Sequence, residues 1–409
     1  MSIRIAIIGG GIAGATLANA LVKHVHLDVH VYESAPEFSE RGAGIGLSYL
    51  ALGALETIIP SAIELFKKKA GAVAVGPARI VIGSGPNTGA IVSDISEDSG
   101  LAMNRAPLLK TLLESLPPKM LHANKKLSTV KQEDSGVVIT FEDGSMESFD
   151  AVVGADGLFS TVRQAIVGVG FEATPAGWWD CRNLLPLDQV KARIGEESFE
   201  VDREFCWVGD EAFMMHAVVE NGTKVQCIIA AMENDPPKTR KRSITRETLE
   251  NALRKGWLGN PVATGMVELM LDQADPQAYS IWEHRSTPCY ARGRLCIVGD
   301  AAHATSPWQG AGASLAVEDC VILGHLLGQV ASVDTIEAAF RAFDIVRRPR
   351  CQGVIDTGLA SGQLFCGQNP DVGLDSEKMG PAIGELYTDL DSLDITLHME
   401  DASKQFKLL

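Results

Sequence analysis

The apolar positions at the start of the chain predict a strand, a helix and a second strand, in that order. Residues 3–8 are apolar apart from one arginine, which is typical of a buried strand. After a glycine-rich turn, apolar residues recur at helical spacing: Ala13, Leu17, Ala20 and Leu21. The next apolar run ends at Glu33. This order predicts the first half of a Rossmann dinucleotide-binding fold.

The turn between that strand and helix has the glycine spacing of a phosphate-binding loop. Gly9 allows the tight turn, Gly11 lets backbone approach a pyrophosphate, and Gly14 lets the helix pack close to the sheet. Unpaired N–H groups and the helix dipole at this end favour an anion. Glu33 is placed to accept from the hydroxyls of an adenosine ribose. A glycine-rich buried turn, the alternative, explains neither the preceding strand nor Glu33.

Further along, the same kinds of pattern predict a hairpin over residues 76–100 and a helix over 105–116, stopped by two prolines. The dipeptide Asp143-Gly144 predicts another hairpin turn. Residues 175–285 differ, because alternating apolar runs predict an antiparallel sheet inserted into the nucleotide-binding fold. The last forty residues predict helical pieces.

Two more apolar runs each predict a strand with an aspartate just beyond its end. Residues 151–154 precede Asp156, and the run RLCIVG precedes Asp300. Ligands in parallel sheets bind at the carboxyl ends of strands. Gly310 and Gly312 then precede a helix that begins near Ala313, which offers a second anion-directed helix end. One chain thus has two such turns and two acidic strand ends.

Composition narrows the classes of function that the chain can have. The 36 basic and 52 acidic residues give a net charge of −16, which argues against nucleic-acid binding and leaves anion capture to local features. The eight cysteines form no CxxC pair, so neither zinc nor a redox dithiol is indicated, and we expect no metal. The apolar stretch 5–22 carries the glycine pattern, so no membrane span is predicted. We expect a cytoplasmic enzyme, either a monomer or a homodimer.

These motifs together resemble those of the class A FAD-dependent flavoprotein monooxygenases, and of the salicylate hydroxylase-like group in particular. GGGIAG with Glu33 resembles the ADP-binding motif, DAVVGADGLFSTVR the DG motif, and GRLCIVGDAAHATSPWQGAGASLAVEDC the GD motif. The resemblance covers residues 1–365. It implies an α/β, glutathione-reductase-type FAD-binding Rossmann fold with an inserted antiparallel β-sheet substrate domain and C-terminal helices.

The resemblance also implies domain bounds and a chemistry. Residues 1–75, 101–175 and 286–365 would form the FAD-binding domain, 76–100 and 176–285 the substrate sheet, and 366–409 a C-terminal helical segment. The family reduces FAD with NAD(P)H and adds dioxygen at the flavin. The resulting C4a-hydroperoxide hydroxylates a small phenol or aromatic acid. The alternatives are a flavin oxidoreductase that does not hydroxylate, or a non-enzymatic nucleotide-binding protein.

The family's cofactor positions carry over residue by residue. Asp156 and Gly157 would lie near the pyrophosphate and the nicotinamide path, and Asp300 on the ribityl hydroxyls. Gly46, Arg105 and Ala313 would lie against the flavin. Gly310 to Ala313 would stabilise the negative charge of reduced flavin at its pyrimidine edge.

Three residues are candidates for the catalytic site. Arg182 would hold the substrate's oxygen anion, and its alternative is a surface arginine on an edge strand. His216 would orient or deprotonate a phenol, and its alternative is a hydrogen-bonded sheet histidine. Pro307 would form a wall of the substrate pocket.

For other residues the structural interpretation is favoured. His303 is better explained as structural, the basic run from Lys238 to Arg242 as a solvated loop rather than a nicotinamide site, and the tryptophans as core. Two departures from the family pattern, GAGIGLSYLAL and the missing Tyr-Pro pair at His216, lie on the substrate side. The identity of the substrate therefore does not follow from the sequence.

Overall fold

The computed structural model describes residues 2–39, 44–95, 98–199, 203–219, 222–253, 256–257, 259–388 and 390–409. Its central sheet has six strands in the order β19-β20-β12-β1-β2-β8. These are β1 (Ile3–Ile8), β2 (Leu27–Tyr32), β8 (Leu121–His122), β12 (Ala151–Gly154), β19 (Ala291–Arg292) and β20 (Leu295–Ile297). All neighbours are parallel except β19 and β20. This is the predicted Rossmann sheet.

A second, eight-stranded sheet has the order β17-β18-β13-β16-β15-β14-β5-β6 and is called the substrate sheet below. Its strands are β5 (Ala78–Ile82), β6 (Ile91–Ile95), β13 (Thr174–Pro186), β14 (Glu204–Gly209), β15 (Ala212–Val219), β16 (Lys224–Met232), β17 (Lys241–Ser243) and β18 (Gln277–Glu283). The predicted 76–100 hairpin is β5–β6. The sheet is not wholly antiparallel, because β5 arrives from the N-terminal half and joins β14 in parallel.

Two smaller sheets complete the strands. An antiparallel meander consists of β9 (Leu127–Glu133), β10 (Gly136–Phe141) and β11 (Met146–Phe149), with the predicted Asp143-Gly144 turn between the last two. The other sheet contains β3 (Gly44–Ser48), β4 (Val73–Val75) and β7 (Gly100–Asn104).

The helices divide between the two large sheets. The helices α1 (Ile12–Leu21), α2 (Tyr49–Glu56), α3 (Ala62–Ala70), α4 (Arg105–Leu113), α5 (Thr161–Val167), α9 (Asp300–His303) and α10 (Gly312–Leu327) belong to the Rossmann part. The apolar cluster on one face of the substrate sheet includes residues of α6 (Leu187–Ile194), α7 (Arg246–Ala252) and α8 (Pro261–Leu271). Helix α4 ends three residues before the predicted Leu116.

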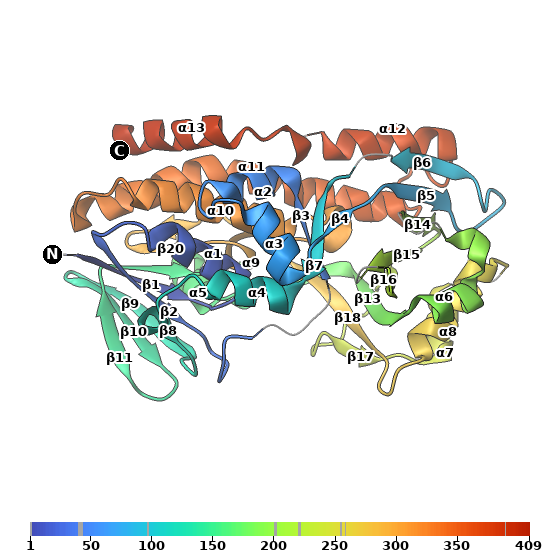
Figure 1. Ribbon diagram of the computed structural model, residues 1–409, viewed down its shortest axis with the longest axis horizontal. Helices are drawn as coiled ribbons and strands as arrows, with labels where there is room; N and C mark the ends of the chain where they lie inside the picture. The colour runs from blue at the N-terminus through green and yellow to red at the C-terminus, as the bar shows by residue number, and fades with distance from the viewer. Residues whose placement is uncertain are drawn as a thin grey trace.

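Three C-terminal helices join the two halves of the molecule. The long helix α11 (Ile336–Phe365) runs across both, and α12 (Ser376–Tyr387) and α13 (Ile395–Leu408) lie along it (Figure 1). Within the described residues, none of these or the other helices combines the length and the apolar character needed to span a bilayer.

Helices α1 and α10 pack closely against each other and run parallel. A Cβ atom at Gly299 would lie 3.1 Å from the Cβ of Ala13 on α1 and 3.3 Å from that of Ala316 on α10. One Cβ at Gly324 of α10 would lie 2.5 Å from the Cβ of Ala20 on α1. Both pairs advance together along the chain, so the two helices are parallel and their N-termini point to the same side of the sheet.

This close approach predicts opposite effects for two glycine-to-alanine changes. Gly324→Ala should lower the free energy of unfolding by about 1–3 kcal/mol, because the new methyl overpacks the α1–α10 contact. Gly353→Ala, in the exposed middle of α11 with no atom within 4 Å of its Cβ position, should raise it by about 0.5–1 kcal/mol. Urea unfolding of the two variants measures both. Equal effects of the two changes would contradict the inferred packing.

Candidate functional site

Four parallel strands of the Rossmann sheet end level with one another. The register pairs Ile8 of β1 with Tyr32 of β2 and with Gly154 of β12, and Gly154 with Ile297 of β20. The residues just beyond these ends are those singled out in the sequence: Gly9, Glu33, Asp156 and Asp300. The fold therefore brings three acidic residues and the glycine turn to one edge, where ligands of parallel sheets bind.

The glycine turn leaves no room for side chains. Gly9 has a φ of +107°, and a Cβ there would lie 2.2 Å from the carbonyl oxygen of Ala155. A Cβ on Gly14 would lie 2.0 Å from the Gly9 carbonyl oxygen. Gly11 is the N-cap of α1, and no side chain caps that helix end. Its first N–H groups and its dipole are thus directed at the strand edge, as an anion site requires.

Glu33 is held beside this turn. One carboxylate oxygen accepts from the backbone N–H of Gly10 at 2.8 Å, and the other accepts from that of Ala35 at 2.8 Å. The side chain is half-buried. Each carboxylate oxygen can accept more than one hydrogen bond, so the fixed carboxylate keeps acceptor capacity for hydroxyl groups.

Asp156 acts differently from the other acidic strand ends. Its carboxylate accepts from the Ser160 hydroxyl at 2.5 Å and from the Thr161 backbone N–H at 2.8 Å. Burial raises the pKa of Asp156, although these hydrogen bonds oppose the shift. Its carboxylate therefore faces the start of α5, and its backbone, next to Gly157 with a φ of +74°, forms the turn against Gly9.

Asp300 is exposed and begins the four-residue helix α9. Buried charged groups hold this short helix at both ends. The N–H of Gly299 donates to Asp319 of α10 at 3.0 Å. Arg163 of α5 donates to the carbonyls of Ala301 and Ala302 at 3.1 and 3.0 Å. An anion at the N-terminal end and a cation at the C-terminal end both complement the helix dipole.

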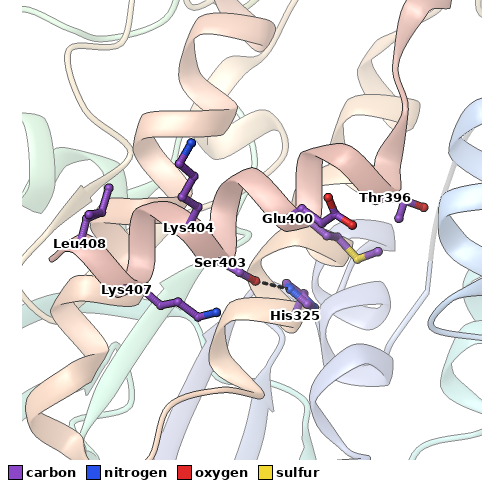
Figure 2. A pocket seen from close by; sticks show the side chains of 8 residues that line it. His325, Thr396, Glu400, Ser403, Lys404, Lys407 and Leu408 are labelled. Carbon is purple, nitrogen blue, oxygen red and sulfur yellow. Dashed lines mark hydrogen bonds between the residues drawn. The ribbon is translucent and has the colours of Figure 1, made fainter.

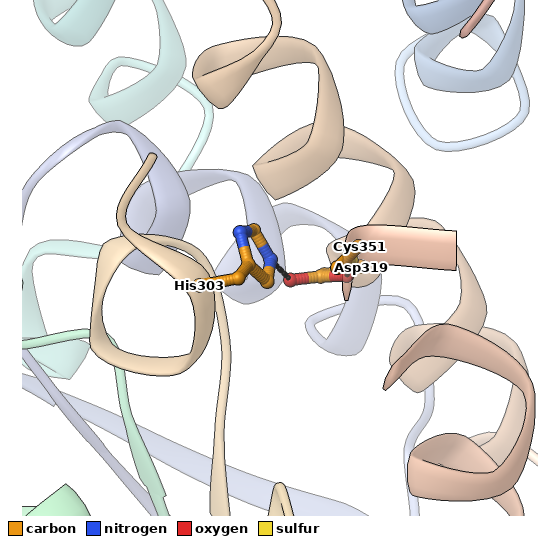
Figure 3. Close-up of side chains that lie close together, drawn as sticks. All are labelled: His303, Asp319 and Cys351. Carbon is orange, nitrogen blue, oxygen red and sulfur yellow. Dashed lines mark hydrogen bonds and ion pairs between the residues drawn. The ribbon is translucent and has the colours of Figure 1, made fainter. Parts of the chain in front are cut away.

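Asp319 belongs to an ionic network in which Asp319, His303 and Arg347 are fully buried. His303 lies 2.5 Å from one carboxylate oxygen of Asp319 (Figure 3). The Arg347 guanidinium lies 2.8 Å from the other. Arg347 also pairs with Glu318 at 2.8 Å, and Glu318 pairs with Arg350. His303, Asp319 and Cys351 offer atoms within 4.8 Å of one another. A metal cation there would face the Arg347 charge, so we interpret the group as an ion network, which agrees with the structural interpretation of His303.

The network shifts the pKa values of His303 and Asp319 in opposite directions. Burial acts to lower the pKa of His303, but Cys351 and Asp319 outweigh it and raise that pKa well above its usual value. Burial acts to raise the pKa of Asp319, but His303 and Arg347 lower it to about 2. His303 and Asp319 are therefore both charged across the neutral pH range. The sequence patterns did not indicate Asp319 or Arg347 as residues of this site.

The second anion-directed helix end lies beside the smaller sheet. Helix α10 begins at Gly312 without a side-chain cap, and Gly310 is exposed with a φ of +62°. The Ser48 backbone N–H at the end of β3 donates to Ser314 at 3.1 Å, which brings the strand of Gly46 to the start of α10. Gly46 is exposed, and β3 pairs with β7, the strand directly before the half-buried Arg105. These predicted flavin contacts, with the half-buried Ala313, therefore lie around one helix end.

The candidate substrate residues divide between two faces of the substrate sheet. Arg182 alternates with Asp180 and Trp178 on one face of β13, and it pairs with Asp180 at 2.6 Å. Trp178 contacts Trp308 of the 3-10 helix η3 (Pro307–Gln309), so this face looks toward the Rossmann part. Pro307 is exposed at the start of η3. Arg182 and Pro307 thus belong to the same side of the sheet.

His216 lies on the opposite face. Its Nε2 is 2.7 Å from the Ser198 carbonyl, and its ring stacks on Phe205 at 5.1 Å. Trp207 also packs there, in the apolar cluster that includes α6, α7 and α8. Burial lowers the pKa of His216 to about 4. The structure does not bring His216 to Arg182 and Pro307. His216 pairs with Cys227 and Cys227 with Asn183, so His216 shares the face of Asn183, and Arg182, one position earlier, faces the other way. Its hydrogen-bonded surroundings match the structural alternative, and we do not retain it in the site.

A separate surface groove of about 570 Å³ lies between α13 and α10 (Figure 2). Its lining includes His325, which is 2.7 Å from the Ser403 hydroxyl, together with Lys404 and Lys407. None of the cofactor or substrate residues predicted above lines it. The groove is therefore distinct from the strand edge.

Fold and site together are those of a dinucleotide-binding protein: a Rossmann glycine turn with its carboxylate, a second uncapped helix end, and an exposed carboxylate beyond a further strand. The comparisons agree. Residues 7–45 match an NAD(P)-binding Rossmann-like domain, and residues 78–357 match an FAD binding domain. The chain belongs to the family of FAD-dependent monooxygenases in which these domains occur.

Two curated relatives and one solved structure illustrate the similarity. A 6-methylsalicylate 1-monooxygenase of Aspergillus terreus is 33% identical over 89% of this chain and 83% of its own length. A salicylate hydroxylase of Sarocladium schorii is 30% identical over 88% of this chain and 81% of its own. A salicylate hydroxylase substrate complex matches with a TM-score of 0.84, 22% identity and 98% coverage of both chains, which confirms the fold.

Glu33→Ala should weaken FAD binding roughly tenfold to a hundredfold. A hydrogen bond to a charged group is worth about 1.5–3 kcal/mol, and the change also releases the Gly10 N–H that Glu33 holds. Titration of the flavin-free protein with FAD, followed by flavin fluorescence, measures the change. Glu37→Ala, an exposed carboxylate on the same loop, is the matched control. Equal affinities for the two variants would contradict the assignment.

The buried His303 predicts a loss of stability toward alkaline pH. Its folded-state pKa is raised, so its contribution is full below its ordinary pKa of 6.5 and is lost as the pH rises through the folded value. Between pH 6.5 and 9, the free energy of unfolding should fall more steeply in the wild type than in His303→Gln, by up to about 1.4 kcal/mol per pH unit. Urea unfolding at several pH values measures both slopes.

His216→Gln is the control for this titration. Its folded-state pKa is lowered, so the stability it affects is lost as the pH falls from 6.5 toward about 4. This variant should change the acid side of the profile and leave the alkaline slope as in the wild type. Equal alkaline slopes in His303→Gln and the wild type would refute the assigned charge of His303.

Proposed function

We propose that this FAD-dependent monooxygenase hydroxylates a small aromatic acid or phenol of the salicylate type, with NAD(P)H and dioxygen as co-substrates. The activities for which the 30–33% identical relatives are named support this substrate class. The observation that carries the proposal is that η3, between Asp300 and the start of α10, meets an aromatic face of the substrate sheet.

The residues present fit FAD. We infer that Gly9, Gly11 and Gly14 accommodate its pyrophosphate at α1, that Glu33 accepts from its adenosine ribose, and that Asp300 accepts from its ribityl hydroxyls. Gly46, Arg105, Gly310, Gly312 and Ala313 would lie along the flavin ring, with Asp156 and Gly157 forming the neighbouring turn. When bound, FAD supplies the electron transfer from NAD(P)H and the activation of dioxygen.

The chain's own groups would orient the reactants and exclude water. The positive end of α10 would stabilise negative charge at the pyrimidine edge of the ring. Pro307 and the aromatic side chains behind it would form a dry wall against which an aromatic ring can stack. Arg182, exposed and paired with Asp180 on the same sheet face, would attract an anionic substrate.

We propose that residues 76–100 and 176–285 form the substrate domain. Residues 1–75, 101–175 and 286–365 would form the FAD-binding domain, and residues 366–409 the C-terminal helical segment. We also propose a cytoplasmic monomer or homodimer. All eight cysteines are free, and six of them are buried, which agrees with a reducing compartment.

The purified, FAD-loaded protein should oxidise NAD(P)H faster in the presence of salicylate or 6-methylsalicylate. The product should gain one oxygen atom, and under ¹⁸O₂ that atom should carry the label. Mass spectrometry of the product and NAD(P)H absorbance measure both. NAD(P)H oxidation that yields only hydrogen peroxide, with every phenol and aromatic acid tested, would favour a flavin oxidoreductase that does not hydroxylate.

A further inference from the structure

Two indole N–H groups at the junction of the two large sheets have no oxygen or nitrogen acceptor within the described residues. Trp178 of β13 and Trp308 of η3 are only 3% and 8% exposed, and their rings meet edge to face at 5.5 Å. Neither indole nitrogen has a hydrogen-bond partner among the residues that the structure describes. The Trp178 nitrogen has the Cys366 thiol nearby, and sulfur is a weak acceptor.

Burial alone does not explain these donors. Trp257 is fully buried, yet its indole N–H donates to the Asp210 carbonyl at 3.1 Å. Trp207 directs its own N–H at His216. A buried donor without an acceptor costs about 1–3 kcal/mol, so such groups in a folded protein call for an explanation.

The surroundings of Trp308 show further unsatisfied polar groups. The hydroxyls of Thr305 and Ser306, just before Pro307, are also buried without a partner in the described chain. Helix α11 approaches this segment through glycine, because a Cβ on Gly362 would lie 2.4 Å from the Trp308 indole nitrogen. Several hydrogen-bonding groups without a partner in the described chain therefore lie on the loop that joins Asp300 to the start of α10.

The same place offers aromatic faces. Phe213 of β15 meets Trp308 edge to face at 5.6 Å, and Phe365 of α11 lies 6.3 Å from Trp308. Aromatic rings surround one another at these distances through offset and edge-to-face contacts. An aromatic ring with an oxygen substituent matches both properties of the site, since it can stack and can accept from an N–H.

We propose that the indole N–H groups of Trp308 and Trp178 bind an oxygen acceptor, a carboxylate or phenolate oxygen, of the aromatic substrate. This inference rests on the proposed function and specifies how that substrate is selected. A ligand without such an oxygen leaves the buried Trp308 N–H unpaired and the Trp178 N–H with only the weak thiol acceptor of Cys366. Selection against it therefore exceeds what apolar contacts alone provide.

The test uses FAD-loaded wild type and the variants Trp308→Phe and Trp178→Phe, which keep a ring and remove the N–H. Flavin absorbance or fluorescence changes give Kd values for salicylate, benzoate, phenol and toluene without turnover. Trp308→Phe should weaken salicylate binding about tenfold while toluene binding changes little, so the ratio of the two Kd values shifts. Benzoate and phenol show whether the carboxylate or the hydroxyl is the acceptor.

Trp257→Phe is the matched control, because its N–H has an acceptor in the protein and it should leave that ratio unchanged. A structural role for Trp308 would weaken all four ligands alike, and this result overturns the proposal. So does an unchanged ratio in both variants, or a wild type that binds none of the oxygen-bearing ligands. Binding that depends on the indole N–H without hydroxylation of any probe would instead refute only the proposed function.

Discussion

The position of Asp300 depends on charges that are buried behind it. Helix α9 has only four residues, too few to be stable alone, and it is held by Asp319 at its beginning and Arg163 at its end. Asp319 is fixed in turn by His303 and Arg347. Removing one partner of such a buried group leaves an uncompensated charge, which commonly costs about 3–5 kcal/mol. The exposed Asp300 carboxylate is therefore supported by charged groups buried behind it.

A strongly acidic protein must hold an anionic dinucleotide by local means. The parallel packing of α1 and α10 provides this, because it brings two uncapped helix N-termini to one side of the sheet. The same packing requires small residues at Ala20 and Gly324 along the contact. Anion binding and helix packing thus act on the same two helices. The first needs their uncapped N-termini, and the second needs small residues along their contact.

Much of this arrangement was predictable from the sequence. The first βαβ unit, the hairpins and the strand ends follow from local periodicity and turn residues, and the fold prediction is confirmed. Whether Arg182 and His216 share a face depends on the strand register, which joins residues far apart in the chain. Patterns near His216 did not show that it packs with Phe205 and Trp207. Arg163, Asp319 and Arg347 were missed for a related reason. Their charges suggest surface positions, and only the tertiary contacts show that they are buried together.

Helix α11 contains thirty residues and is about 45 Å long. Near its middle Arg347 anchors the ionic network, and about three and four turns later Gly358 and Gly362 face the loop that carries Trp308. One helix therefore contacts both the ionic network behind Asp300 and the loop that carries Trp308, through separate stretches. A substitution at Gly358 or Gly362 would therefore disturb the Trp308 loop and leave the contacts of Arg347 with Asp319 in place.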